Sequence, residues 1–154
     1  SAPVLTIILE AEDVIQGVRD ALGATFVQKA SPDTLRGKYG IWAGINIAHA
    51  SDAPETASKE IALWTNESDL KESSDAEDEA RAYIAKHHAG NADYTMEIRN
   101  IVKEAIANKD QSEEVLSSLK DFLGKDAEGI PDDQISALAE VIFDFVIEEI
   151  EKAE

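Results

Sequence analysis

The sequence predicts an α+β protein built from two parts, and three observations support this fold class. Residues 1–70 contain two short apolar runs separated by a helical pattern, as in a mixed domain. Residues 71–78 are polar and acidic, which is typical of a linker. Residues 79–154 show only the apolar spacing of helices. We therefore expect a small mixed domain, an acidic linker and an all-helical extension.

The first part begins with residues 3–10, an apolar run rich in β-branched side chains and typical of a buried strand. Residues 11–23 follow with apolar side chains at helical spacing, and Gly23 is a common helix stop. Residues 24–40 have no period and contain proline and two further glycines. We expect a long loop there, and loops of that length in compact domains are usually functional or disordered.

A second strand is expected at the later end of residues 41–50, which form another short apolar segment. A helix should follow it and run to about Trp64. Ser51 or Asp52 is the expected cap, because short oxygen-bearing side chains accept hydrogen bonds from the first amides of a helix. Pro54 suits the first turn, where its missing N–H costs nothing.

Four helices are expected in and just before the extension. The last of them carries apolar side chains over more than half of its circumference. A helix of that kind is buried, either against its neighbours or against another chain. The expected ranges are 77–90, 94–109, 112–124 and 131–154.

Composition excludes several classes of function. A formal charge of −18 over 154 residues opposes nonspecific binding to nucleic acid or to anionic membranes. No apolar run is long enough to cross a bilayer. The absence of cysteine excludes disulfides and thiolate metal sites. The adjacent His87 and His88 would point about 100° apart on a helix and could not chelate together, so no metal site formed by protein side chains is expected.

One histidine, His49, lies between an apolar run and a helix start, and its surroundings resemble the nucleoside diphosphate kinase family. The resemblance covers residues 1–70 and preserves the order and spacing of the motifs. The matching stretches are "APVLTIILEAEDVIQGVRDALGAT" (2–25), "SPDTLRGKYG" (31–40) and "NIAHASDAPETASKEIALW" (46–64).

The resemblance implies a phosphotransferase that works through a phosphohistidine. The family moves the γ-phosphate of a nucleoside triphosphate onto a histidine and then onto a nucleoside diphosphate. By resemblance, His49 is the phosphorylated residue, Glu60 is the partner that orients its ring, and Ser51 lies nearby. A neutral imidazole needs such a partner, because only one tautomer presents the correct nitrogen.

The resemblance also assigns the nucleotide-binding residues. Arg19, Thr25 and Arg36 match positions that contact phosphate, and Asn46 matches the position that touches the sugar. Positioned cations and donors of this kind neutralise the charge of the transferred phosphoryl group. Mg²⁺ is the implied cofactor, and it would be held mostly by the nucleotide and water.

This sequence departs from the family pattern in three respects. Ile45 stands where arginine is usual, and Ala50 stands where glycine is usual. The family's opening strand, its phosphate-binding lysine, and the later tyrosine and base-stacking phenylalanine have no counterpart here. We therefore expect an incomplete ferredoxin-like fold, whose two non-adjacent strands need either a preceding segment of a longer chain or a protein partner to complete the sheet.

Two functions follow from these features. The first is a working nucleoside diphosphate kinase with an added helical tail, expected in the cytoplasm. The alternative is a catalytically degenerate, kinase-like structural or interaction module of a larger assembly. An axonemal complex of the cilium, or another cytoskeletal assembly, is the example that the acidic, apolar-faced tail suggests. The sequence leaves the choice between enzyme and scaffold open.

Overall fold

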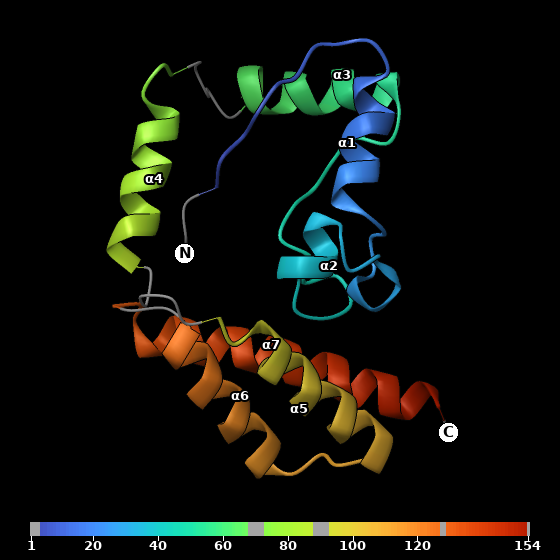
Figure 1. Cartoon of the computed structure of the whole chain (residues 1–154), viewed down its shortest axis with the longest axis vertical. Helices are drawn as coiled ribbons and strands as arrows, with labels where there is room; N and C mark the ends of the chain where they lie inside the picture. Colours follow the sequence, from blue (N-terminus) through green and yellow to red (C-terminus); the bar gives the residue numbers. More distant parts are fainter. Residues whose placement is uncertain (1–3, 68–72, 88–92, 127–128, 154) are drawn as a thin grey trace.

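The computed structural model describes residues 4–67, 73–87, 93–126 and 129–153, and every regular element in these ranges is a helix. Figure 1 shows α5, α6 and α7 side by side at one end of the molecule and α1, α2 and α3 toward the other. The elements are α1 (Val14–Leu22), η1 (Val27–Lys29), α2 (Leu35–Tyr39), α3 (Pro54–Ala62), η2 (Leu63–Glu67), α4 (Ala76–His87), α5 (Thr95–Asn108), α6 (Glu113–Asp126) and α7 (Asp132–Lys152).

The main hydrophobic core lies between α5, α6 and α7, which pack on one another as the apolar faces of their sequences predict. Burying each large aliphatic side chain contributes about 1.5–3 kcal/mol, so this bundle is the main source of stability. The expected burial of the last helix therefore occurs against two of its neighbours. Helix α4 contributes no described side chain to this core. The most deeply buried side chains are Ile98, Val102, Leu119, Ile142 and Val146.

The strand expected in residues 3–10 does not form in the described part of that segment. Residues 4–10 are exposed and form no regular element, and Figure 1 draws them as a single extended trace. A strand exists only through hydrogen bonds to a neighbouring strand, and the described residues supply none. The α+β expectation, and with it the ferredoxin-like sheet, is therefore not met by this structure. The described part of the chain is helical.

The strand expected within residues 41–50 is also absent, because its apolar side chains are used differently. The segment turns back on itself through hydrogen bonds from the Ile41 amide to the Ile45 carbonyl and from the Ile45 amide to the Trp42 carbonyl, both 2.8 Å. This turn places Trp42 and Ala43 in the same core as the three-helix bundle. The first part of the chain is thereby joined to the extension.

The long loop expected over residues 24–40 contains two short helices, η1 and α2. Thr34 begins α2, and its hydroxyl accepts a hydrogen bond from the Gly37 amide at 3.2 Å. The start of α3 also differs from expectation, because its N-cap is Ala53 rather than Ser51 or Asp52. Asp52 instead accepts a hydrogen bond from the Thr56 side chain.

Candidate active site

His49 and Ser51, in the segment before α3, both contact Glu60 of α3. The Nε2 atom of His49 lies 2.8 Å from Oε1 of Glu60, and the Ser51 hydroxyl donates to Oε2 of Glu60 at 2.6 Å. The His49 side chain is 75% exposed, so its ring is open to a ligand.

The Glu60 carboxylate is held in its charged form. Hydrogen bonds from Ser51 first, and from His49 second, lower the pKa of Glu60 below its ordinary value of 4.5. An ionised carboxylate can only accept, so the contact with His49 requires the proton to lie on Nε2. When the ring is neutral, Nδ1 then carries the lone pair. The arrangement selects one tautomer of a neutral imidazole.

Asp52 is a further carboxylate at the site, and the family resemblance did not single it out. The hydrogen bond from Thr56 is the main cause of its lowered pKa, and the charge of Arg19 lowers it further, as does that of His49 when the ring is protonated. The signal was present in the sequence, since Asp52 follows the histidine by three residues. Its role could not be assigned because capping of α3 was the simpler interpretation.

Arg36 is a buried residue that fixes the chain before His49. Its guanidinium donates from Nη1 to the Gly23 carbonyl at 2.9 Å and from Nη2 to the Ala48 carbonyl at 2.7 Å. Burial lowers its pKa, and the nearby charge of Arg19 lowers it further. Arg36 therefore ties the end of α1 to the histidine segment, a structural role in addition to the expected contact with phosphate.

Arg19 and Thr25 line one shallow hollow of about 340 Å³ between α1 and the loop that follows it. Asn46 is joined to this region, because its side-chain amide donates to the Thr25 carbonyl at 2.7 Å. The charge of Arg19 lowers the pKa values of both Arg36 and Asp52. The sequence-predicted residues thus form one neighbourhood around the histidine segment.

The backbone before His49 is strained. Ile47 adopts a φ of 70°, a left-handed conformation that is costly for a β-branched residue. Strain of about 1–3 kcal/mol at one residue is common near functional sites, where surrounding contacts hold it. Here the hydrogen bond from Arg36 to Ala48 and the bond between Asn46 and Thr25 flank the strained residue.

The isoleucine that replaces the family's arginine has a clear structural reason. Ile45 is partly buried and packs against the core of the three-helix bundle. A charged guanidinium at this position would meet that apolar surface. The departure seen in the sequence therefore goes together with the helical extension, which the family motifs alone could not have indicated.

Comparison with known proteins gives a match to the first part only. Residues 1–70 match the family model described as nucleoside diphosphate kinase. The nucleoside diphosphate kinase of Carboxydothermus hydrogenoformans is 47% identical over 70 residues, which are 46% of this chain and 47% of that protein. The corresponding protein of Synechococcus elongatus is 46% identical over 72 residues, or 47% and 48% of the two chains.

The chain thus spans about half the length of the curated relatives it matches. No solved structure matches it significantly. Within the described ranges, no helix combines the length and the apolar character needed to cross a bilayer. The resemblance that the motifs predict is confirmed: residues 1–70 are similar to about half of the length of nucleoside diphosphate kinases.

Proposed function

We propose that this chain carries the phosphohistidine half-site of a nucleoside diphosphate kinase, with His49 as the phosphorylated residue. The observation that supports this most directly is the shared carboxylate of Glu60, which contacts Nε2 of His49 and the hydroxyl of Ser51. Such a contact orients an imidazole that must attack in line. The substrates are nucleoside tri- and diphosphates.

The reaction has two half-steps. The Nδ1 lone pair of His49 attacks the γ-phosphorus of a nucleoside triphosphate, the Nδ1–P bond forms, and the bond from phosphorus to the β-phosphate oxygen breaks. A nucleoside diphosphate leaves. In the second half-step, a terminal oxygen of another diphosphate attacks the same phosphorus and the Nδ1–P bond breaks. Glu60 stabilises the Nε2 proton throughout, while Nδ1 gains and loses the phosphoryl group.

Arg19 and Arg36 would neutralise the charge of the phosphates, and Thr25 would contact a phosphate through its side chain. Asn46 is assigned to the sugar. Mg²⁺ bound to the nucleotide would neutralise phosphate charge when present. The described residues contain no group of three or more His, Asp and Glu side chains arranged for a metal.

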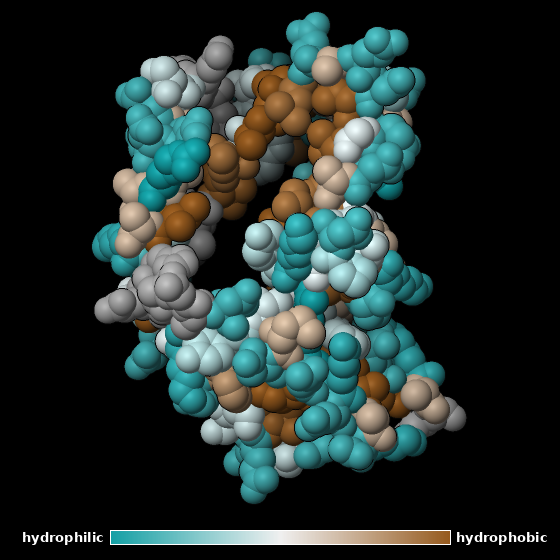
Figure 2. Space-filling view, in the orientation of Figure 1, coloured by the Kyte–Doolittle hydropathy of each residue, from teal (hydrophilic) through white to brown (hydrophobic). Residues whose placement is uncertain are grey.

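A complete site requires additional polypeptide, which we propose pairs with residues 4–10. These residues carry unburied aliphatic side chains, with Val4 82% and Ile7 64% exposed. Figure 2 shows apolar surface along this part of the molecule. A strand that is apolar on both faces is typical of the interior of a sheet. The missing strands would come from a preceding segment or from a protein partner.

The test is phosphorylation of the chain by ATP labelled at the γ-phosphate. We expect acid-labile label, because phosphohistidine hydrolyses in acid, and we expect the label to disappear in His49→Ala and to remain in His87→Ala. The assay is run on the chain alone and with the missing half of the domain supplied as a longer chain. Absence of label on His49 under both conditions would refute the catalytic proposal.

One observation favours the alternative of a structural or interaction module. The hydrogen bonds of the Arg36 guanidinium go to backbone carbonyls, so this cation already serves the fold. A degenerate site would keep those bonds without turnover. Calorimetric titration with a nucleoside diphosphate separates the two functions, because a scaffold is expected to bind no nucleotide even when the sheet is completed.

A further inference from the structure

We propose that Arg99, in the helical extension, is a positioning residue for His49. Arg99 fixes the loop that carries Arg36, and Arg36 fixes the residue before the histidine. This inference rests on the proposed role of His49. It assigns a task to the extension, which lies outside the segment similar to nucleoside diphosphate kinases.

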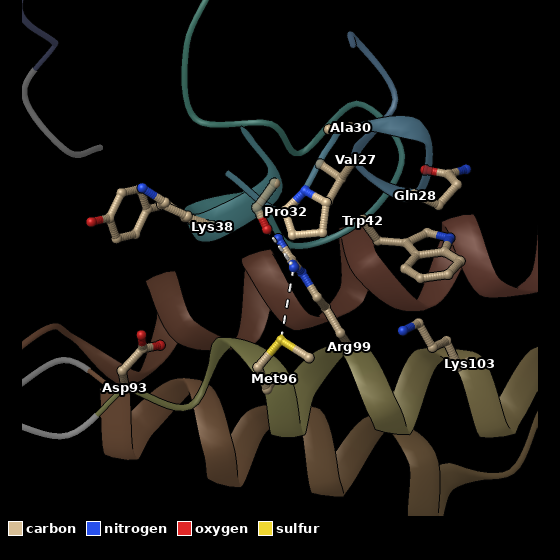
Figure 3. Close-up of a pocket in the computed structure, with 12 residues that line it drawn as sticks. Val27, Gln28, Ala30, Pro32, Lys38, Trp42, Asp93, Met96, Arg99 and Lys103 are labelled. Carbon is tan, nitrogen blue, oxygen red and sulfur yellow. Dashed lines mark hydrogen bonds between the residues drawn. The ribbon is translucent and has the colours of Figure 1, made fainter. Parts of the chain in front are cut away.

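Arg99 reaches out of α5 and binds the backbone of the loop around α2. Nε donates to the Gly40 carbonyl at 2.9 Å, Nη1 donates to the Gly37 carbonyl at 2.7 Å, and Nη2 donates to the Arg36 carbonyl at 3.2 Å. Figure 3 shows the side chain rising from α5 toward the loop, with Pro32 above it. Residues more than fifty positions apart are joined in this way.

The guanidinium is buried, with only 9% of the residue exposed. Burial lowers the pKa of Arg99, while the nearby charge of Asp93 opposes that shift. A desolvated cation needs several acceptors, and here they are the carbonyls of Arg36, Gly37 and Gly40 at the end of α2. The Arg36 carbonyl also accepts from the Gly40 amide at 3.0 Å. The contact therefore satisfies both sides, and it caps the C-terminal end of α2.

The loop is shaped to accept this contact. A Cβ at Gly37 would lie 1.9 Å from the Ser31 carbonyl oxygen, and one at Gly40 would lie 2.5 Å from the Val27 side chain. Only glycine allows such a tight path. The carbonyls of both residues accept hydrogen bonds from Arg99.

The second step of the connection runs through Arg36. Its carbonyl accepts from Arg99, while its guanidinium donates to the Ala48 carbonyl at 2.7 Å. His49 follows Ala48 directly. On the other side of the histidine segment, Ile45 packs against the bundle core. Two connections thus hold the segment to the extension. One is the packing of Ile45, and the other is the chain of hydrogen bonds from Arg99 through Arg36 to Ala48.

Loss of Arg99 should therefore loosen α2 and displace the His49 ring from Glu60 without removing any group that touches nucleotide. Displacement of a reacting group by about 1 Å can reduce a rate about 100-fold. We expect Arg99→Gln to lower the rate constant of His49 phosphorylation at saturating nucleotide by about 10- to 100-fold. The KM for the nucleoside triphosphate should change less than threefold or so, since binding residues remain.

The matched control is Lys103→Gln. Lys103 lies one turn further along α5 and lines the same hollow as Arg99, but its side chain is exposed. The Lys103→Gln substitution removes one positive charge from α5, as Arg99→Gln does. We expect Lys103→Gln to phosphorylate within about twofold of the unchanged chain, and Arg99→Lys, which keeps the charge with fewer donors, to fall between the two.

A second measurement does not depend on activity. Long-range ¹H–¹⁵N spectra of the histidine rings report which nitrogen of His49 carries the proton. We expect the Nε2–H form in the unchanged chain and in Lys103→Gln, and a mixture of tautomers in Arg99→Gln. That result would support the positioning role even if no phosphohistidine forms, in which case only the proposed function fails.

Identical His49 ring spectra in Arg99→Gln and Lys103→Gln, with both variants retaining helical circular dichroism, would overturn the inference. Where phosphohistidine forms, equal phosphorylation rates in the two variants would do the same. If Arg99→Gln fails to fold, Arg99→Lys decides the case by the same two measurements. An Arg99→Lys variant that folds and matches Lys103→Gln in both would also overturn it.

Discussion

Ser51 donates to one carboxylate oxygen of Glu60 at 2.6 Å, and the other oxygen of that carboxylate lies 2.8 Å from Nε2 of His49. The two contacts are not independent. Ser51 fixes the carboxylate in rotation and keeps it ionised, and the ionised carboxylate fixes the tautomer of His49. The orientation of the proposed nucleophile therefore depends on a serine whose hydroxyl donates to Glu60.

Ser51→Ala should raise the pKa of Glu60 toward 4.5, because the hydrogen bond from Ser51 is the largest cause of the lowered value. A carboxylate with a lowered pKa contributes stability above its unfolded pKa and loses it as pH falls through the folded pKa. The Glu60 contacts should thus persist below pH 4.5 in the unchanged chain and be lost at higher pH in the variant. Carbon-13 spectra of the Glu60 carboxyl measure both midpoints.

Ser58→Ala is the control for that titration. Ser58 lies on α3 and its hydroxyl donates to the Pro54 carbonyl at 2.9 Å, so the substitution removes a hydroxyl from the same helix without touching Glu60. Its Glu60 midpoint should equal that of the unchanged chain. A Ser51→Ala midpoint equal to the Ser58→Ala midpoint would contradict the assigned cause.

Glu60→Gln tests the carboxylate itself. The amide can still accept from Nε2, but it carries no charge to favour the Nε2–H form or to stabilise the ring as phosphorus approaches. We expect the rate of His49 phosphorylation to fall about 10- to 100-fold, the size of a lost orienting contact. Glu55→Gln, an exposed change in the first turn of the same helix, should leave the rate within about twofold. Equal losses in both variants would point to a general charge effect.

The parts of the fold that are local in sequence were predictable. Helix α1 ends before Gly23, and α5 to α7 follow their apolar spacing within a few residues. Met96 has the apolar spacing of α5 but is 53% exposed and lines the hollow beside Arg99. The two strands could not be predicted correctly from local pattern, because a strand is defined by a partner.

The site divides in the same way. The meeting of His49 and Glu60 follows from their spacing across one helix start, so a motif can carry it. The burial of Arg36, the docking of Ile45 and the reach of Arg99 depend on how the extension packs onto the first part. Contacts between residues 37 and 99 leave no trace in either local sequence.

Gly37→Ala should destabilise the chain, because the added Cβ would lie 1.9 Å from the Ser31 carbonyl oxygen and backbone would have to move. Overpacking of this kind costs about 1–3 kcal/mol. Gly44→Ala is the matched control, since a Cβ there meets nothing within 4 Å. Denaturant unfolding followed by circular dichroism should give a lower midpoint for Gly37→Ala only. Equal midpoints would show that the loop is less tightly fitted than this geometry requires.

Leu119→Ala should destabilise the first part of the chain and the bundle by the same amount. Leu119 is fully buried in α6, and its truncation should cost about 2–5 kcal/mol. Leu138→Ala, at a position on α7 that is 38% exposed, should cost less than about 1 kcal/mol.

In a Trp64→Phe background the remaining tryptophan, Trp42, reports the turn before His49. Because Trp42 shares the bundle core, its emission and the helical signal should change at the same denaturant concentration, and Leu119→Ala should shift both equally. Separate transitions would mean that the histidine segment is not stabilised by the extension.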